Sequence, residues 1–215
     1  MSDQRSIPPH PPSVDDVDPA SLRIVHYPAE VLRQRTEIAP EPGPAAAAVA
    51  ERMIALMRDA PGIGLAAPQV GLPWRMFVAH VPPPPPEDAA ADDDGEPLFV
   101  EDDAGNRWDL FTAEPEAYID PVVRGYSKDL EPFEEGCLSL PEVTGTVRRP
   151  SAIEIEYTTP TGERKVRRAA GLLARCWQHE IDHLDGVLII DKFSPLDRRK
   201  AKRELEELEA RAGLW

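Results

Sequence analysis

The sequence predicts an α+β fold built as one domain. Hydrophobic periodicity indicates a helix near residue 50, several strands in the middle, a helix near residue 180 and another at the end. Strands and helices do not alternate one by one, as a βαβ repeat requires, and no internal repeat is present. We therefore expect a single domain over residues 21–215. A tail rich in Pro, Asp and Ser precedes it, and we expect residues 1–20 to be disordered.

The first expected helix spans residues 44–59. The preceding stretch, LRIVHYPAEVLRQRTEIA, predicts an extended segment that leads into a short helical one. In the helix itself, Val49, Met53 and Met57 recur at helical spacing and give it one apolar face. Pro61 and Gly62 are expected to end it.

Strand-like segments follow this helix. WRMFVAHV (74–81) predicts a strand, and the Pro-rich, acidic stretch from 82 to 108 cannot supply a core, so we expect an insert there that forms a mobile surface loop. Residues 117–127 resume strand patterning. Residues 151–168 predict a hairpin that turns at Thr161-Gly162, because apolar residues alternate with glutamates before the turn.

Two helices are expected in the C-terminal part. Residues 169–185 carry an apolar helical stripe, and Gly186 is placed to cap the C-terminus of this helix. Ser194 as N-cap and Pro195 at the first position begin a C-terminal helix over residues 194–212. Its basic residues come first and its glutamates follow, which is typical of a helix with i, i+4 ion pairs.

Composition argues against a membrane protein and against a nucleic-acid binder. The chain has no run of about 18 apolar residues and no secretory signal, so we expect a cytoplasmic protein without a membrane partner. The formal net charge is −15, whereas sequence-specific nucleic-acid binding needs a basic face. Cys137 and Cys176 are the two cysteines. A disulfide is not expected in the cytoplasm, so each is a candidate metal ligand or buried thiol.

Residues 178–186, QHEIDHLDG, contain an H-E-x-x-H motif. On a helix, His179 and His183 share one face and can reach a single metal, with Glu180 beside them. The flanking residues are apolar, and ionisable groups on a buried helix need a partner such as a metal. Two histidines do not complete a metal site, so the motif calls for a third ligand.

Two routes to the third ligand imply a metallopeptidase. The metzincin pattern would need a histidine at position 189, where the chain has Ile189, so this class is excluded. A gluzincin-type peptidase uses a glutamate on a later helix, and Glu204, Glu206 and Glu207 are the candidates. These glutamates also fit as ion-pair partners on a solvated helix face.

Cysteine offers another route. Cys137 lies in a turn-like loop, EEGCLSLPE, and a Cys–His–His set leaves one position open for catalysis. Cys176 is less suitable, because it lies about 10 Å from His183 along the helix axis. We expect Cys176 to be a buried thiol under the site.

A glycine-rich stretch, PGIGLAAPQVGL (61–72), separates the first helix from the first strand. Gly62 and Gly64 form a G-x-G arrangement, but a phosphate loop would need further glycines or a lysine and would follow a strand. Glycines also let an extended peptide backbone come close. Gln69 is a neutral amide on an otherwise apolar stretch and is suited to polarising a carbonyl.

Together, GIGLAAPQVG, EGCLSLP and QHEIDHLDG resemble the three signature motifs of the bacterial peptide deformylase family, in the family's order. The resemblance extends from about Ile24 to Phe193. It implies a hydrolase that removes the N-formyl group from the formyl-methionine of nascent polypeptides and releases formate. It also implies antiparallel or mixed sheets packed around a central helix that carries the H-E-x-x-H motif, with a C-terminal helix.

The resemblance implies roles for single residues. It makes Cys137, His179 and His183 the ligands of one divalent metal, and it makes Glu180 the general base that moves a proton from water to the departing amine. Charge on the formyl oxygen would be stabilised by the Gln69 amide and the Leu138 backbone N–H. The residues implied to hold the peptide, shape the methionine pocket or orient neighbouring groups are Gly62, Ile63, Gly64, Glu135, Gly136, Leu172 and Cys176.

Metal identity and partners follow only from the resemblance. One thiolate and two imidazoles suit zinc or Fe(II), and the family favours Fe(II) in the cell, with Zn, Ni or Co as replacements. The expected partners are N-formylmethionyl nascent peptides, and also the ribosome if the C-terminal helix docks there. Two features depart from the family: the longer insert over 82–108, and Thr144, where many members carry a basic residue. A gluzincin-like metallopeptidase and an inactive metal-binding relative are the alternatives, and a monomer is expected.

Overall fold

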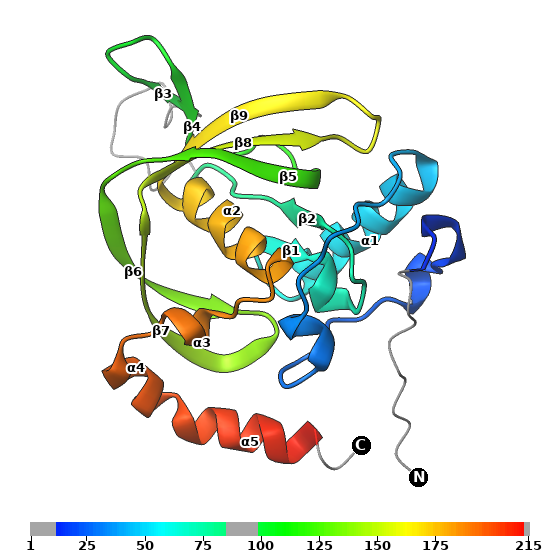
Figure 1. Cartoon of the computed structure of the whole chain (residues 1–215), viewed down its shortest axis with the longest axis vertical. Helices are drawn as coiled ribbons and strands as arrows, with labels where there is room; N and C mark the ends of the chain where they lie inside the picture. Colours follow the sequence, from blue (N-terminus) through cyan, green and yellow to red (C-terminus); the bar gives the residue numbers. More distant parts are fainter. Residues whose placement is uncertain (1–11, 85–98, 213–215) are drawn as a thin grey trace.

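The computed structural model describes residues 12–84 and 99–212. Within them, a seven-stranded sheet has the strand order β1-β2-β5-β8-β9-β4-β3, and β6 and β7 form a separate two-stranded sheet (Figure 1). Neighbouring strands of the large sheet are antiparallel except β4 and β9, which are parallel. The strands are β1 (Gly64–Ala66), β2 (Met76–Ala79), β3 (Phe99–Glu101), β4 (Arg107–Asp109), β5 (Glu116–Tyr126), β6 (Leu130–Cys137), β7 (Leu140–Pro150), β8 (Ala152–Thr158) and β9 (Arg164–Ala170).

The helices flank these sheets. Four short 3-10 turns occur between residues 12 and 84: η1 (Val14–Asp16), η2 (Pro19–Ser21), η3 (Glu30–Arg33) and η4 (Ala67–Val70). The α-helices are α1 (Pro44–Asp59), α2 (Gly171–Leu184), α3 (Ile189–Lys192), α4 (Pro195–Lys200) and α5 (Lys202–Ala212). Among the described residues, none of these helices has both the length and the apolar character needed to cross a membrane.

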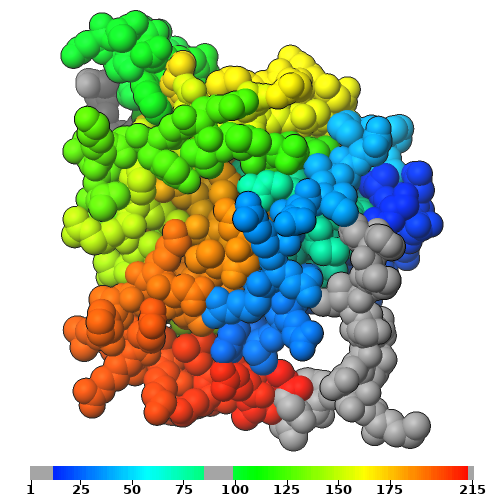
Figure 2. Space-filling view, in the orientation of Figure 1, coloured from blue at the N-terminus to red at the C-terminus, as the bar shows by residue number. Residues whose placement is uncertain are grey.

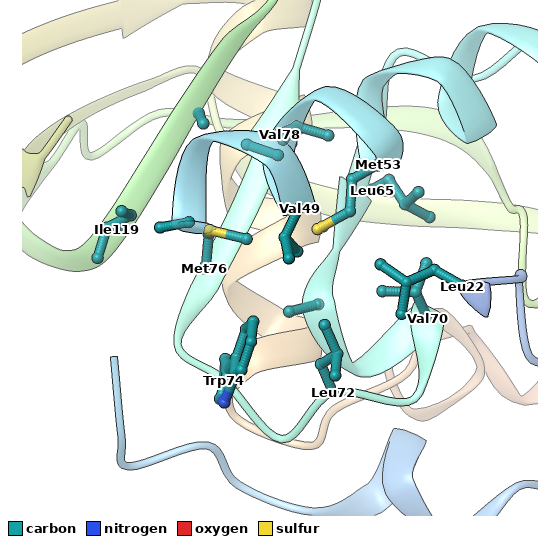
Figure 3. Packing of buried hydrophobic residues seen from close by; sticks show 14 of the residues in the cluster. Leu22, Val49, Met53, Leu65, Val70, Leu72, Trp74, Met76, Val78 and Ile119 are labelled. Carbon is teal, nitrogen blue, oxygen red and sulfur yellow. The ribbon is translucent and has the colours of Figure 1, made fainter. Parts of the chain in front are cut away.

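The first part of the core lies between α1 and strands β1 and β2. Pro44 occupies the first position of α1, where its missing N–H costs nothing. Val49, Met53 and Met57 are fully buried along one face of the helix, and Figure 3 shows Val49 and Met53 grouped with Leu65, Met76 and other apolar residues. This packing places β1 and the following turn η4 against the rest of the fold.

Helix α2 is buried against both sheets. It contacts β1, β2, β8 and β9 of the large sheet and β7 of the small one, and most of its residues are buried. Its Trp177 is fully buried and meets the ring of Tyr118 edge to face at a centroid distance of 5.3 Å. In Figure 1, α2 lies below the large sheet and beside the curved β6–β7 hairpin.

A third apolar cluster joins the β6–β7 hairpin to the C-terminal helices. Leu140 and Val147 of β7 pack with Leu188, Phe193 and Leu208. Helix α5 is also tied to the N-terminal part of the chain, because the Tyr27 hydroxyl donates to Glu209 Oε1 at 2.7 Å. In Figure 2, α5 forms the lower edge of the molecule, below the blue N-terminal segment.

Several predictions from the sequence are confirmed. The fold class is α+β, with one mixed and one antiparallel sheet, and α1 has the predicted bounds. Strands β8 and β9 form the predicted hairpin around Thr161-Gly162. Helix α2 ends just before Gly186, whose φ of +73° is in the left-handed region expected of a C-terminal cap.

The N-terminal segment differs from the expected disordered tail over residues 1–20. Residues 1–11 lie outside the described part of the chain. From residue 12 the chain forms η1 and η2, and Val14 and Val17 pack against the first core cluster. These two apolar side chains anchor a segment whose overall composition is that of a flexible tail.

The insert over 82–108 contains regular structure where a loop was expected. Residues 85–98 of it lie outside the described part of the chain. Strands β3 and β4 form an antiparallel hairpin, and β4 bridges to β9 at the edge of the large sheet. The guanidinium of Arg107 lies 4.0 Å from the centre of the Phe99 ring, and the Trp108 indole donates to Asp102 at 3.0 Å. Local contacts of these few aromatic residues therefore stabilise a hairpin in an insert whose acidic composition predicted a loop.

The C-terminal helix expected over 194–212 is interrupted. It divides at Ala201 into α4 and α5. Ala201 and Leu208 are buried in the third apolar cluster, which is called the hairpin cluster below. The N-terminal signals are confirmed, because Ser194 Oγ accepts from Asp197 N at 3.1 Å and Pro195 opens the helix. The predicted ion pairs also form, between Lys202 and Glu206 and between Arg203 and Glu207.

The cap at Gly186 allows a test with a matched control. A Cβ at Gly186 would lie 2.6 Å from the backbone oxygen of Arg33, whereas a Cβ at Gly105, with nearly the same φ of +75°, would meet nothing within 4 Å. Each Gly→Ala change costs about 1 to 2 kcal/mol for the left-handed backbone. Gly186→Ala should cost about 1 to 3 kcal/mol more, because the overlap forces the backbone to shift.

Urea unfolding of both variants in buffer that contains EDTA measures this difference in the free energy of unfolding. Equal losses for Gly186→Ala and Gly105→Ala would contradict the close packing of the α2 terminus on the segment around Arg33.

Candidate metal and catalytic site

Three potential metal ligands meet where β6 ends against α2. Cys137 is the last residue of β6, and His179 and His183 lie one turn apart on α2. Their ligand atoms all lie within 4.8 Å of one another, and Cys137 Sγ is 3.2 Å from His183 Nε2. The sequence left the third ligand open between Cys137 and a later glutamate. The fold brings Cys137 to both histidines.

The glutamates of the gluzincin alternative lie elsewhere. Glu206 and Glu207 are on α5 and pair with Lys202 and Arg203 of the same helix. Ile189, which replaces the metzincin histidine, is buried in the hairpin cluster. Over residues 12–84 and 99–212, the metal-ligating group at the H-E-x-x-H motif consists of Cys137, His179 and His183, without a glutamate from α5.

A buried carboxylate, Glu135, orients the first histidine. Glu135 Oε2 lies 3.1 Å from His179 Nδ1, so Nε2 of the same ring is left to bind a metal. Arg149 clamps the carboxylate with two hydrogen bonds, from Nε to Oε1 at 2.6 Å and from Nη2 to Oε2 at 2.8 Å. Burial opposes the charge on Glu135, but the bonds from Arg149 and His179 outweigh it, and the pKa of Glu135 lies well below its usual range.

The two histidines have opposite electrostatic environments. Burial alone would lower the pKa of His179, but hydrogen bonds with Cys137 and Glu135 outweigh this effect and raise the pKa of His179 to about 10. At His183, burial lowers the pKa well below the usual value, and the charges of His179 and Arg149 act in the same direction. His183 is therefore a neutral imidazole, the form that binds metals.

These residues fit one divalent metal ion. The donor set is a thiol and two imidazoles, which suits Zn or Fe(II). Within the described residues, His183 Nδ1 is buried without a hydrogen-bond partner, so the His183 ring is not held by a carboxylate as the His179 ring is.

Glu180 points a carboxylate into the same site. It is 3% exposed, and within the described residues its Oε2 has no hydrogen-bond partner. Burial raises the pKa of Glu180 to about 7. The side chain needs Gly64 opposite it, because a Cβ there would overlap Glu180 Oε1 and lie 2.9 Å from Cys176 Sγ. A carboxyl group that titrates near neutral pH is suited to accepting and returning a proton.

Gln69 presents its amide nitrogen to the site. Its Oε1 accepts from the backbone N–H of Ala66 at 2.8 Å, which fixes the direction of the amide. Its Nε2 then faces Ser139 Oγ at 3.3 Å and Cys137 Sγ at 3.5 Å. The turn η4 and strand β1 thus carry a hydrogen-bond donor to the position next to the ligands.

A pocket of about 430 Å³ opens onto these groups. Its lining contains every substrate-binding residue that the sequence predicted: Gly62, Ile63, Gly64, Glu135, Gly136, Leu172 and Cys176. Gln69, Cys137, Leu138, His179 and Glu180 also line it. The buried thiol of Cys176 lies under the site as predicted and donates to the Ile63 carbonyl at 3.3 Å.

Several residues of the site have no clear signal in the sequence. Arg149 is paired with Glu135, but it is 14 residues away in sequence, and no spacing rule connects the two. Phe133 and Arg175 line the pocket. Arg175 precedes His179 by one helical turn, and this i, i+4 relation was a signal that could have placed it at the site.

Several known proteins are similar to this chain. A family model described as polypeptide deformylase matches residues 21–199. The peptide deformylase of Rhodopseudomonas palustris is 36% identical over 188 residues, which cover 87% of this chain and 94% of that protein. That of Salinibacter ruber is 40% identical over 187 residues, which cover 87% and 88%.

Solved structures are similar as well. A peptide deformylase from Plasmodium falciparum matches with a TM-score of 0.72 and 30% identity, over 89% of this chain and 98% of that one. The peptide deformylase from Ehrlichia chaffeensis has a TM-score of 0.71 and 29% identity, over 89% and 96%.

The raised pKa of His179 predicts that metal binding releases protons. At pH 8 the solution is below the pKa of about 10, so the imidazolium keeps its proton until a metal displaces it. Titrating the metal-free protein with Ni(II) or Zn(II) in weak buffer should release at least one proton per ion, measured with an indicator dye. Binding without proton release would contradict a protonated His179 in the metal-free protein.

Proposed function

We propose that this chain, which belongs to the peptide deformylase family and removes N-formyl groups from nascent polypeptides, uses Cys137, His179 and His183 as metal ligands and Glu180 as the general base. The enzyme is a hydrolase that acts on formyl-methionyl peptides. The observation that carries the assignment of residues is the convergence of Cys137, His179 and His183, of which Cys137 and His179 line a pocket together with Glu180.

The family uses a single divalent metal, and the ligand set supports its placement between β6 and α2. When bound, the ion supplies a Lewis acid that polarises the formyl carbonyl and lowers the pKa of a water. The protein's own part is to hold the three donors in place. Glu135 and Arg149 keep the His179 ring turned toward Cys137.

Glu180 carries the proton in this proposal. Its Oε2 has no competing partner among the described residues, and its pKa of about 7 lets it accept a proton from water and then deliver it to the departing amine. Gly64 leaves room for the carboxylate beside the substrate. We propose that α2 acts as the central scaffold of the site, because it supplies both histidines and Glu180.

Gln69 and Leu138 stabilise the oxygen of the formyl group. The Gln69 amide nitrogen is already directed at Cys137 Sγ, and Leu138 follows Cys137 in the chain, so its backbone N–H is close to the same ligand. Loss of one such donor typically lowers the rate by about 10² to 10³. The formyl group fits because its carbonyl carbon bears only hydrogen, where an acetyl group would bring a methyl group.

The pocket selects the methionine side chain and the peptide backbone. Ile63, Leu172 and Cys176 provide an apolar lining. Gly62 and Gly64 on one side, and Glu135 and Gly136 on the other, allow the peptide to lie as an added strand. Contacts of this kind engage the backbone irrespective of its sequence, as a nascent-chain enzyme requires.

The identity of the metal, the cellular compartment and a contact with the ribosome are also part of the proposed function. We propose Fe(II) as the metal in the cell, with Zn, Ni or Co able to replace it. We also propose that the protein works in the cytoplasm as one catalytic domain over residues 21–215, and that its C-terminal helices dock on the ribosome. The basic residues Arg198, Arg199 and Lys202 beside the groove between α4 and α5 support this last point.

Replacement of Glu180 tests the general base. Glu180→Gln should lower kcat for formate release from formyl-Met-Ala-Ser by about 10² to 10⁴, because the amide cannot accept the proton. Formate is measured under anaerobic loading with Fe(II) or Ni(II), and bound metal is measured in the same samples. Glu163→Gln, at an exposed turn far from the pocket, is the matched control and should keep wild-type activity.

Activity within tenfold of wild type in fully loaded Glu180→Gln would remove Glu180 from this role. Release of free amino acids without formate would instead favour the gluzincin-like alternative.

A further inference from the structure

Arg175 is a buried arginine on α2 that forms hydrogen bonds with strands outside this helix. It is 8% exposed, and it precedes His179 by one turn. Its Nη1 donates to Glu135 Oε1 at 2.7 Å and to the Val147 carbonyl at 3.1 Å. Its Nη2 donates to the Glu131 carbonyl at 2.7 Å. A buried guanidinium is costly unless its donors are satisfied, and here β6 and β7 satisfy them.

These contacts join the two elements that carry the metal ligands. Glu131 and Glu135 are on β6, which ends at Cys137, and Arg175 is on α2, which carries both histidines. Arg175 and His179 contact different oxygens of the same carboxylate, Oε1 and Oε2 of Glu135. Glu135 therefore transmits the position of Arg175 to the His179 ring.

Arg149 and Arg175 connect the β6–β7 hairpin to α2 at two different points. Arg149 extends from β7 to Glu135 and to Asp182, which lies beyond His179 on α2. Arg175 connects the hairpin to α2 on the other side of His179. The Phe133 ring lies 5.3 Å from the Arg175 guanidinium and covers it at the pocket wall. With both arginines in place, the hairpin is held on α2 both before and after His179.

We propose that Arg175 is a positioning residue that sets the placement of Cys137 relative to His179 and His183, and thereby the retention of the metal. The proposal rests on the metal ligands of the proposed function. Without the guanidinium, Glu135 loses a hydrogen bond that holds Oε1, and two backbone carbonyls lose their donor. Changes to groups that orient metal ligands typically cost about 10- to 100-fold in metal affinity.

The test compares Arg175→Met and Arg175→Lys with Arg167→Met. Arg167 is a matched control because it also forms a carboxylate pair, with Asp109 at 2.6 Å, and a further pair with Glu116, but on the β9 side of the fold. Both methionine variants lose an arginine–carboxylate cluster, so both should be less stable than wild type. Only Arg175 contacts the metal-ligand network.

The first measurement is the rate at which a chelator removes Ni(II) from the loaded protein. Arg175→Met should lose metal at least about tenfold faster than wild type. Arg175→Lys should lie in between, because one ammonium can keep the Glu135 contact but not all three. Arg167→Met should stay within about twofold of wild type. Equal rates for wild type and Arg175→Met, or an equal acceleration in both methionine variants, would overturn the proposal.

The second measurement is the visible spectrum of the Co(II)-loaded proteins, which reports the geometry around the thiolate. The bands should shift in Arg175→Met and not in Arg167→Met, and an unshifted Arg175→Met spectrum would overturn the positioning role. Steady-state assays at saturating metal should give a lower kcat with KM changed by less than about threefold. A rise in KM alone would overturn the positioning role and would indicate that Arg175 acts only by lining the substrate pocket.

Failure of the proposed function is recognised separately. It would appear as wild-type protein that releases no formate, or as a wild-type Co(II) spectrum without a thiolate band. The second result would remove the ligand set on which the role of Arg175 rests.

Discussion

The carboxylate of Glu135 is a buried negative charge that has to be neutralised by groups from outside its own strand. Removing such a charge from water costs several kcal/mol unless it is paired and hydrogen-bonded. Arg149 comes from β7, and Arg175 and His179 come from α2. Arg149 belongs to the same hairpin as Glu135, whereas Arg175 and His179 reach the carboxylate only when the β6–β7 hairpin lies against α2. That docking brings Cys137, two residues after Glu135, to the histidines.

The same constraint separates the roles of the two carboxylates in the site. Glu135 is surrounded by cations, and its pKa is depressed, so it stays ionised and holds His179. Glu180 lacks an ion-pair partner among the described residues, and burial raises its pKa to about 7. Environments that push two neighbouring carboxyl groups apart in pKa are a common way to divide structural and proton-transfer roles. Here Arg149 extends the network to Asp182, which also pairs with Lys192.

The parts of this account that could be predicted from the sequence are those with local signals. The H-E-x-x-H spacing, the cap at Gly186 and the amphipathic face of α1 each follow from the geometry of one helix. The contact of Arg149 with Glu135 could not be found in this way, because it depends on the register of β6 against β7. The hairpin β3–β4 and the packing of Val14 and Val17 could not be predicted either. Each depends on a few apolar residues, whereas the prediction used the average composition of the whole segment.

The proposed ligand set of one thiolate and two imidazoles can be measured directly by X-ray absorption at the metal edge of the Zn-loaded protein. We expect one sulfur scatterer at about 2.3 Å and two imidazole nitrogens at about 2.0 to 2.1 Å. A first shell without sulfur, or with a second sulfur from Cys176, would contradict it.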